Sequence, residues 1–499
     1  MTVVLKERNC MYVIGLDIGT TGTKAIIVDE RGKIAGDGYS GYKLITDGVC
    51  VEQDAEEWWT ASKLAIGKAL GALNSREVEA ISVSSQGGTT VALDAAGNAI
   101  GNAITWLDSR SSSEANQMRQ ELGDDYVYKT TGWRISPAMD SAKIMNMKKN
   151  GYCEKAVIFA STLEFINRKL VGTAVIDPTN AGIRQLFNIS TGIWDKKILE
   201  VIGCTEKELP MIEPTGKEIG RLCANAAKEL NLCDKVRVFN GAHDQYCASL
   251  GSGAVEAGDM LISSGTTWAV MGITKKALAT PSYIASCPHP VKGLYGNMVS
   301  LSGAGTSFQW IKDSIFKDES FEEIDRMCEK RVAKCRDLFF IPALSGAAYP
   351  LWVSEAKGGF LGADLSTDRY DLALAAMESA AFSVKAAIED FVENGCPTNS
   401  VRIMGGATKS KIWMSILRSV IDIPIIKMSV ADTCALGAAA IALTSMGEFK
   451  SYKDAANSLT TSDEIQGCSE NVKAYYAEKY KEFRKIFAYT VRYYKGEQI

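Results

Sequence analysis

Two stretches of the chain share one pattern of apolar and polar positions. In residues 12–28 an apolar run leads into Gly19-Thr20-Thr21, and a second apolar run follows. In residues 259–272 the same order recurs around Gly265-Thr266-Thr267. Two apolar runs joined by a turn rich in glycine and hydroxyls predict a β-hairpin. Recurrence about half a chain apart indicates two similar domains, although chance recurrence of a common hairpin explains the pattern equally well.

Strand-like and helix-like segments alternate over the rest of the chain. Asp54 is suited to cap a helix that starts at Ala55, because its carboxylate accepts hydrogen bonds from free N–H groups. This alternation predicts α/β domains. We expect strands at residues 78–84, 236–240 and 401–404, and helices at residues 372–392, 435–443 and 472–494.

The length of 499 residues predicts more than one domain, since single cores rarely exceed about 250–300 residues. A boundary is expected in the small, glycine-rich residues 251–258. We therefore predict an N-terminal domain at 11–252 and a C-terminal domain at 253–446. Residues 447–499 form a predicted helical tail that packs back on the body.

Composition narrows the classes of protein. Net charge is −4 with no long basic run, which argues against nucleic acid or an anionic membrane as the partner. The thirteen cysteines include no CxxC pair and there are only two histidines, so reduced thiols are expected rather than a zinc site. Residues 1–9 carry no apolar signal segment, and no apolar run reaches the roughly 20 residues of a membrane span. A cytoplasmic, soluble protein is expected.

The first hairpin carries candidate phosphate chemistry. Asp17 ends its first strand, just before Gly19-Thr20-Thr21. Backbone amides of such a turn can face a phosphate, and the carboxylate can hold Mg²⁺ directly or through water. Lys24 adds positive charge there or faces solvent. The alternative is a tight hairpin with no ligand.

Asp244 is the candidate catalytic group. It follows the strand at 236–240, in the segment Asn240-Gly241-Ala242-His243-Asp244-Gln245, and is expected to start a helix. A carboxylate there can take the proton of a substrate hydroxyl, and Gln245 can hydrogen-bond sugar hydroxyls. An ordinary helix cap is the alternative interpretation of Asp244. His243 is expected to be structural.

The chain resembles the FGGY family of carbohydrate kinases from about Tyr12 to about Ala442. Its most specific segment is Gly358-Gly359-Phe360-Leu361-Gly362, followed at the family's spacing by Asp371-Leu372 and Ala375-Ala376-Met377-Glu378. The resemblance implies two actin-like (ribonuclease H-like) α/β ATPase domains with an interdomain cleft. It also implies ATP and Mg²⁺ as cofactors.

The resemblance implies roles for further residues. Asp17 assists magnesium, and Asp244 is the general base. The implied nucleotide-binding residues are Thr20, Thr21, Gly265, Thr266, Gly305, Gln309, Gly405, Gly406 and Ser410.

Departures from the family pattern fall in the implied sugar site, which comprises Gln86, Gly87, Gly88, Trp106, Asp108, Asp244 and Gln245. Xylulokinases carry Met-His, and glycerol kinases Arg-Glu, where Gly87-Gly88 stand. The site is expected to be roomier there, or lined by backbone and by neighbours such as Thr89. The segment Trp106-Leu107-Asp108 resembles that of xylulokinases, whereas Asn146 stands where tryptophan is usual.

The sequence therefore predicts an ATP-dependent kinase for a small sugar or polyol, with a ketopentose such as xylulose as the first choice. Ribulose, a tetritol or other polyol, and an aldonate are alternative acceptors. A sugar or nucleotide sensor without catalysis, and an ATPase that acts on protein partners, are alternative classes. The oligomeric state, including a homodimer, is left open.

Overall fold

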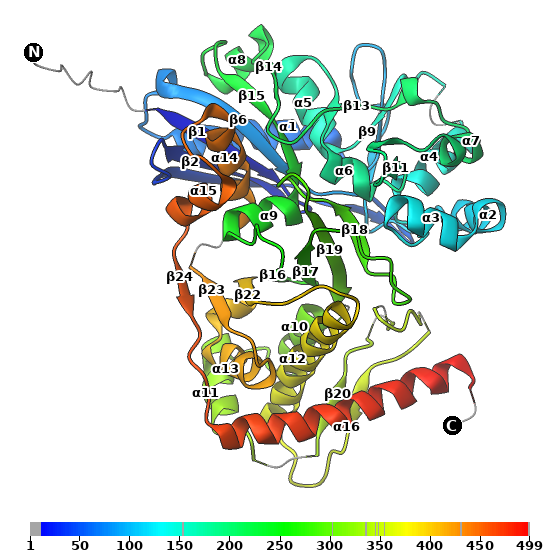
Figure 1. Ribbon diagram of the computed structural model, residues 1–499, viewed down its shortest axis with the longest axis vertical. Coiled ribbons are helices and arrows are strands. Elements are labelled where there is room, and N and C mark those ends of the chain that lie inside the picture. The colour runs from blue at the N-terminus through cyan, green and yellow to red at the C-terminus, as the bar shows by residue number, and fades with distance from the viewer. Residues whose placement is uncertain are drawn as a thin grey trace, which may run out of the picture. The chain divides into compact units, whose positions relative to one another are not determined.

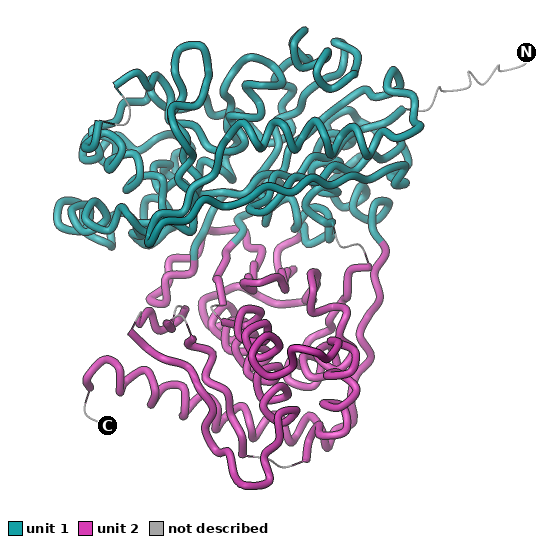
Figure 2. Tube along the Cα trace, turned by 180° about the vertical axis from the view of Figure 1, so that it is seen from behind, with its two compact units in different colours: residues 1–255, 285–296, 432–460 teal, residues 256–284, 297–431, 461–499 magenta. Residues whose placement is uncertain are grey.

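The computed structural model describes residues 11–151, 154–301, 303–334, 337–344, 346–347, 349–353, 355–429 and 432–497, so the prediction for residues 1–9 lies outside these ranges. The chain divides into two compact units, shown in separate colours in Figure 2. Unit 1 comprises Met1–Val255, Ala285–Gly296 and Asp432–Thr460. Unit 2 comprises Glu256–Ile284, Asn297–Ala431 and Thr461–Ile499. Each unit therefore takes three separate segments of the chain.

The main sheet of unit 1 is built around the first predicted hairpin. Its strands lie in the order β14-β15-β6-β1-β2-β3 (Figure 1). β1 pairs antiparallel with β2 and parallel with β6, and β6 pairs parallel with β15. The strands are β1 (Tyr12–Ile18), β2 (Gly22–Asp29), β3 (Ile34–Gly41), β6 (Val78–Ser85), β14 (Glu218–Arg221) and β15 (Arg237–His243).

Shorter strands of unit 1 pair outside the main sheet, as β4-β5-β8, β7-β9, β10-β13 and β11-β12. Their bounds, with that of β18, are β4 (Ile45–Asp47), β5 (Cys50–Gln53), β7 (Val91–Leu93), β8 (Ala103–Ile104), β9 (Ile158–Ala160), β10 (Val175–Ile176), β11 (Phe187–Asn188), β12 (Ile193–Trp194), β13 (Met211–Ile212) and β18 (Ala285–Pro288).

Five helices of unit 1, namely α1, α5, α6, α7 and α15, start at a side-chain cap. The predicted cap of α1 is confirmed, because the Asp54 carboxylate accepts a 2.9 Å hydrogen bond from the Glu56 N–H. The helices are α1 (Ala55–Leu70), α2 (Ser112–Leu122), α3 (Asp124–Thr131), α4 (Asp140–Lys149), α5 (Thr162–Val171), α6 (Pro178–Ile183), α7 (Lys196–Ile202), α8 (Ala224–Leu230), α9 (Asp244–Ser252), α14 (Thr433–Met446) and α15 (Tyr452–Leu459).

Helix α14 is the buried apolar helix predicted at residues 435–443, and it packs closely in unit 1. A Cβ on Gly15 of β1 would lie 1.9 Å from the Ala435 carbonyl oxygen. A Cβ on Gly437 would lie 1.8 Å from the Cys247 carbonyl oxygen of α9. Real Cβ atoms do not come so close, so only glycine allows these backbones to pack at this distance. α9 and α14 thereby lie side by side near β1.

The main sheet of unit 2 repeats the arrangement around the second hairpin. β16 pairs antiparallel with β17 and parallel with β22, which pairs parallel with β23. Its order runs β19-β17-β16-β22-β23-β24. The strands are β16 (Asp259–Ser264), β17 (Trp268–Thr274), β19 (Tyr295–Leu301), β22 (Ser400–Gly405), β23 (Ile425–Met428) and β24 (Ser462–Glu464), with β20 (Phe339–Ile341) and β21 (Gly359–Leu361) as a separate pair.

The long helix α12 forms the centre of the hydrophobic core of unit 2. The terminal helix α16 packs on it through Phe382, whose ring contacts those of Tyr476, Tyr480 and Phe483. A buried ion pair joins Lys479 Nζ to Glu378 Oε2 at 2.6 Å. The helices are α10 (Ala304–Ile315), α11 (Phe321–Glu329), α12 (Arg369–Glu393), α13 (Lys411–Val420) and α16 (Glu470–Lys495).

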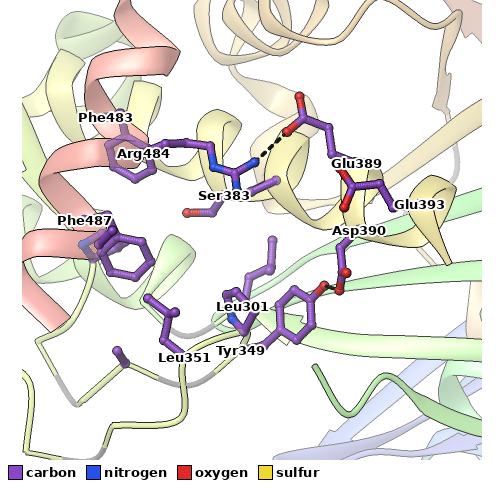
Figure 3. Close-up of a pocket in the computed structure, with 15 residues that line it drawn as sticks. Leu301, Tyr349, Leu351, Ser383, Glu389, Asp390, Glu393, Phe483, Arg484 and Phe487 are labelled. Carbon is purple, nitrogen blue, oxygen red and sulfur yellow. Dashed lines mark hydrogen bonds and ion pairs between the residues drawn. The ribbon is translucent and has the colours of Figure 1, made fainter. Parts of the chain in front are cut away.

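A pocket of about 200 Å³ lies beside α12 and α16 in unit 2 (Figure 3). Phe483, Phe487 and Leu351 form apolar parts of its wall, and Glu389 of α12 pairs there with Arg484 of α16 at 3.0 Å. None of the residues predicted to bind nucleotide or sugar lines this pocket.

Candidate functional site

The carboxyl ends of three parallel strands bring polar groups to one edge of the sheet in unit 1. Asp17 is paired with Ser84 in the register of β1 and β6, and His243 is paired with Ser85 in the register of β15 and β6. Asp244 follows directly as the first residue of α9. Parallel α/β sheets bind ligands at this edge.

Asp17 lies in an acidic environment. The Ser84 hydroxyl donates a 2.6 Å hydrogen bond to Asp17 Oδ1. Burial raises the pKa of the Asp17 carboxyl to about 7, and the carboxylates of Asp244 and Asp432 raise it further against the opposing effect of Lys24. A cation beside Asp17 would offset this excess of negative charge.

Sequence reasoning did not single out Asp432. It immediately precedes α14 and forms an ion pair with Lys24 of β2, so Lys24 does not simply face solvent. An aspartate just before an apolar helix is a recognisable start signal. That signal gives no hint, however, that α14 lies against β1, more than 400 residues earlier in the chain.

Asp244 occupies the N-terminal end of α9 with a side chain that is 26% exposed. Burial raises the pKa of its carboxyl to about 6, although hydrogen bonds from the backbone and side chain of Gln245 lower it. The group is therefore ionised at neutral pH and is a stronger base than a free aspartate, whose pKa is about 3.9.

The acidic edge is suited to Mg²⁺ held by few protein ligands. Across the described residues, no three His, Cys, Asp or Glu side chains form a direct metal cage. Mg²⁺ is usually held by one or two carboxylates, with waters and substrate phosphates completing its shell. Asp17 fits that role, because only its Oδ1 accepts a side-chain hydrogen bond within the described part of the chain.

A hydrogen-bond network fixes the first Gly-Thr-Thr turn. Gln53 Nε2 donates to the Thr20 carbonyl at 2.6 Å, and Gln86 Nε2 donates to Gln53 Oε1 at 2.7 Å. Trp106 Nε1 donates to the Thr20 hydroxyl at 3.0 Å. The structure thus joins two predicted sugar-site residues, Gln86 and Trp106, to the predicted phosphate turn. Gln53 was missed by sequence reasoning, because nothing local marks it.

Asp108 uses its carboxylate within the protein. Oδ2 accepts a 2.7 Å hydrogen bond from the Val51 N–H and lies 2.7 Å from Arg110 Nη2. Arg110 Nη2 is also 2.7 Å from Glu52 Oε1. The side chain of Asp108 is fully buried, so it acts by holding Arg110 and the Val51 backbone in place.

Glycine is required at positions 87 and 88 for different physical reasons. A Cβ on Gly87 would lie 1.6 Å from Ile183 Cδ1 and 2.7 Å from His243 Cδ2. Gly88 has φ +61°, which disfavours other residues, and its carbonyl accepts a 2.6 Å hydrogen bond from Lys143 Nζ. Of the two expectations for this part of the site, a roomier space does not fit Gly87, whereas a lining by neighbours does, because the side chains of Ile183 and His243 fill that space.

In unit 2 the second Gly-Thr-Thr turn contacts the start of α10. A Cβ on Gly305 would lie 2.2 Å from the Gly265 carbonyl oxygen and 2.6 Å from that of Thr266. Thr306 donates a hydrogen bond to the Thr266 carbonyl at 3.3 Å. A turn and a helix N-terminus placed together offer N–H groups to an anion such as a phosphate.

The remaining predicted nucleotide residues lie at the end of β22 and beyond. Gly405 pairs with Ser264 in the sheet register and has φ +99°. Gly406 begins a short 3₁₀ turn, and the Ser410 hydroxyl caps α13 by accepting from the Trp413 N–H at 3.1 Å. The Gln309 amide, in contrast, donates to Asp313 one turn along the exposed face of α10.

The units therefore carry unlike groups of residues: carboxylates and amides in unit 1, and glycine backbone with hydroxyls in unit 2. Two α/β sheets, each with a Gly-Thr-Thr hairpin and a neighbouring parallel strand, fit the two-domain actin-like class of fold, which hosts more than one kind of reaction. Comparison with known proteins narrows this class.

The chain belongs to the FGGY family of carbohydrate kinases. Residues 12–251 match the family's N-terminal domain and residues 260–446 its C-terminal domain. The xylulose kinase of Bacillus subtilis is 26% identical over 489 residues, covering 96% of this chain and 97% of that protein. The glycerol kinase of Thermococcus gammatolerans is 29% identical, covering 89% of this chain and 91% of that protein. The gluconokinase of B. subtilis is 24% identical, covering 88% and 89%.

Solved structures confirm the predicted fold class. A xylulose kinase from Lactobacillus acidophilus matches with a TM-score of 0.91 at 24% identity, covering 97% of this chain and 99% of that one. A gluconate kinase from the same species matches with a TM-score of 0.92 at 24% identity, covering 98% and 100%. The protein is a carbohydrate kinase of the FGGY family, whose members use ATP as the phosphate donor. Among the described residues, none of the helices combines the length and the hydrophobicity of a membrane-spanning segment.

Proposed function

We propose that this kinase transfers the γ-phosphoryl group of ATP to a hydroxyl of a ketopentose such as xylulose, with Asp244 as the general base. In this proposal residues 11–252 form the domain that binds the sugar, residues 253–446 the domain that binds the nucleotide, and residues 447–499 a helical tail. The compact units differ from these bounds, because Ala285–Gly296 and Asp432–Thr460 belong to unit 1 and Thr461–Ile499 belongs to unit 2.

The observation that carries the proposal is the position of Asp244. Its carboxylate lies at the start of α9, beside the strand end that carries Asp17, and remains partly exposed. Gln245 is the next residue, so a hydrogen-bonding amide adjoins the base. A base must reach the proton that it abstracts, and a partly exposed carboxylate at a sheet edge meets that condition.

The proposed reaction is an in-line displacement. The sugar oxygen forms a bond to the γ-phosphorus as the bond from that phosphorus to the bridging oxygen of ADP breaks. The proton of the attacking hydroxyl passes to the Asp244 carboxylate and is later released to solvent. Groups such as Asp244 typically contribute about 10²–10⁴-fold to such reactions, and positioning supplies much of the rest.

Asp17 is proposed to hold Mg²⁺, which offsets phosphate charge when bound. Thr20 and Thr21 in unit 1 are proposed to bind phosphate. The proposed nucleotide groups of unit 2 are Gly265, Thr266, Gly305, Gln309, Gly405, Gly406 and Ser410. Gln86, Gly87, Gly88, Trp106, Asp108 and Gln245 are proposed to shape the sugar site, Asp108 through Arg110 and Val51.

An aldonate is the second candidate acceptor, because matching proteins include gluconokinases as well as xylulose kinases. Other ketoses and polyols are further alternatives, and glycerol kinases match over most of the chain. The identity of the acceptor is therefore tested with several candidate compounds rather than with one.

The test is a coupled ADP-release assay of the purified protein over ketoses, polyols and aldonates, with a reaction lacking acceptor. We expect turnover that depends on acceptor and is highest with a ketopentose. Highest turnover with an aldonate would overturn the ketopentose assignment and leave the kinase assignment intact. Equal ATP hydrolysis with and without acceptor would contradict sugar phosphorylation.

The role of Asp244 is tested with Asp244→Asn on the best acceptor. We expect ATP binding to persist while turnover falls by about 10²–10⁴-fold. Asp54→Asn is the matched control, because it also removes a carboxylate at a helix start and asparagine still caps well. Turnover of Asp244→Asn close to that of the control would remove Asp244 from the base role.

A further inference from the structure

The imidazole of His243 occupies an unusual position beside the proposed base. It ends β15, directly before Asp244, and its side chain is only 9% exposed. Nε2 lies 3.1 Å from Asp244 Oδ1. No described group aligns a hydrogen bond on Oδ1, which is itself buried. The imidazole is thus within donor reach of the carboxylate oxygen that lacks one.

The surroundings of the imidazole determine its charge and which ring nitrogen carries the proton. Nδ1 is buried and has no hydrogen-bond partner among the described residues. Burial lowers the pKa of His243 to about 4, so the ring is neutral at neutral pH and carries a single N–H. Because an acceptor lies near Nε2 and none lies near Nδ1, the proton belongs on Nε2.

A backbone hydrogen bond and a ring contact hold the imidazole of His243 in place. The His243 N–H donates to the Thr179 hydroxyl at 2.8 Å, and the Tyr246 ring packs on the imidazole edgewise at 5.9 Å between centroids. On the side of β6, the ring fills the space next to Gly87, where a Cβ would lie 2.9 Å from Nε2. Only glycine at position 87 leaves the imidazole this position.

We infer that His243 is a positioning residue for Asp244 and that Gly87 is the residue that makes room for it. The Nε2–H directs Oδ1 and leaves the other carboxylate oxygen to face the substrate hydroxyl. Hydrogen bonds at such sites often align only when substrate is bound. This inference rests on the proposed role of Asp244.

Gly87 and His243 are far apart in sequence and adjacent in the structure. At position 87 this chain has glycine, where the family resemblance led us to expect a side chain. Here the imidazole and Ile183 occupy that volume instead. The wall of the proposed sugar site at this point is therefore supplied by the residue that also orients the base.

The first experiment compares His243→Ala, His243→Asn and His243→Gln in steady-state kinetics with the best acceptor. A hydrogen bond to a charged group is worth enough to change rates roughly 10–100-fold. We expect His243→Ala and His243→Asn to lower kcat by about that factor with little change in KM for ATP. We expect His243→Gln, whose longer amide reaches the Nε2 position, to recover most of kcat.

The second experiment is a double-mutant cycle at positions 87 and 243 in an Ile183→Ala background, which removes the other clash. We expect Gly87→Ala to lower kcat when His243 is present and to have little further effect when it is alanine. Additive effects would show that Gly87 and His243 act independently and would overturn the pairing. Thermal unfolding of every variant identifies those that fail to fold.

The outcomes separate this inference from the proposed function. If His243→Ala keeps kcat within about twofold while Asp244→Asn is inactive, His243 only packs, and the base assignment stands. If all three His243 variants lose activity and thermal stability together, without rescue by glutamine, the role is structural and the inference is wrong. If Asp244→Asn itself stays active, the base assignment fails first.

Discussion

The two hairpins of this kinase have the same strand arrangement but are surrounded by different chemical groups. β1–β2 and β16–β17 both turn through Gly-Thr-Thr, and each first strand has a parallel neighbour on its other side. At the position of Asp17 in the first hairpin, the second has Ser263. Asp17 adjoins two other carboxylates and a lysine, whereas the second turn adjoins glycine backbone at Gly305 and Gly405.

The difference indicates a division of labour within a repeated fold. A turn rich in glycine and hydroxyls can offer N–H groups to a phosphate without any charged side chain. Metal binding and proton transfer need carboxylates, and in unit 1 the first turn adjoins those of Asp17, Asp244 and Asp432. The scaffold is therefore common to both units, while the reaction chemistry of the proposal depends on unit 1.

The largest expected effect comes from making the first hairpin resemble the second. We expect Asp17→Ser to lower kcat by about 10³-fold and to raise the magnesium concentration needed for half-maximal rate, because a carboxylate beside the phosphates is lost. Ser263→Ala, at the matching position of unit 2, is the control and should change the rate little. A magnesium titration of Asp17→Ser that overlays the wild type would contradict the metal role.

The next effect concerns the helix that packs on the core of unit 2. Lys479→Ala leaves the buried Glu378 without its partner, and we expect a loss of roughly 3 kcal/mol in the free energy of unfolding. Urea denaturation measures it. Lys479→Met/Glu378→Leu should regain most of the loss, since an apolar pair leaves no buried charge. A single variant as stable as wild type would show that the pair contributes little.

A smaller effect is expected where α9 and α14 pack in unit 1. The Cβ of Gly437→Ala would meet the Cys247 backbone at 1.8 Å, so we expect a loss of about 1–3 kcal/mol. Gly67→Ala in α1 is the matched control, because no atom lies within 4 Å of its added Cβ. That control should gain up to about 1 kcal/mol. Equal stability of the two variants would refute the close packing.

The last expected effect is a pH dependence of stability. The Asp17 carboxyl has a pKa of about 7 in the folded protein and about 3.9 when unfolded. Between these values the folded state keeps a proton that the unfolded chain has lost, so stability falls as pH rises towards 7. Asp17→Asn removes this loss. Without magnesium, we expect its Tm to exceed the wild type by a few degrees at pH 8 and by less at pH 5. A difference independent of pH would argue against the raised pKa.

Local sequence signals predicted the elements well. Both hairpins, the cap at Asp54, the strand before Asp244 and the helix that Asp244 starts are confirmed. The helix predicted at 472–494 is α16, which spans Glu470–Lys495. Each of these rests on neighbours a few residues apart, where periodicity, glycine turns and capping act directly.

Contacts between distant segments could not be predicted in this way. Asp432 adjoins Asp17 only because glycines at positions 15 and 437 allow α14 to pack on β1 and α9. A roomier site was one expectation at Gly87, since no neighbouring residue in sequence shows that His243 and Ile183 fill the space beside it. Asp108 pairs with Arg110 two residues further on, but its hydrogen bond from the Val51 N–H, 57 residues earlier, could not be predicted from neighbouring residues.

The sequence by itself determined the family, the repeated hairpins and the carboxylates at positions 17 and 244, because these are encoded in short motifs with fixed spacing. Only the tertiary structure decided which charges surround Asp17, which ring contacts Asp244, and why glycine stands at position 87. Packing acts over a few ångströms and electrostatic effects over a Debye length of about 10 Å, and both are independent of distance along the chain. The geometry of the proposed site therefore depends on how helices and strands far apart in sequence pack together.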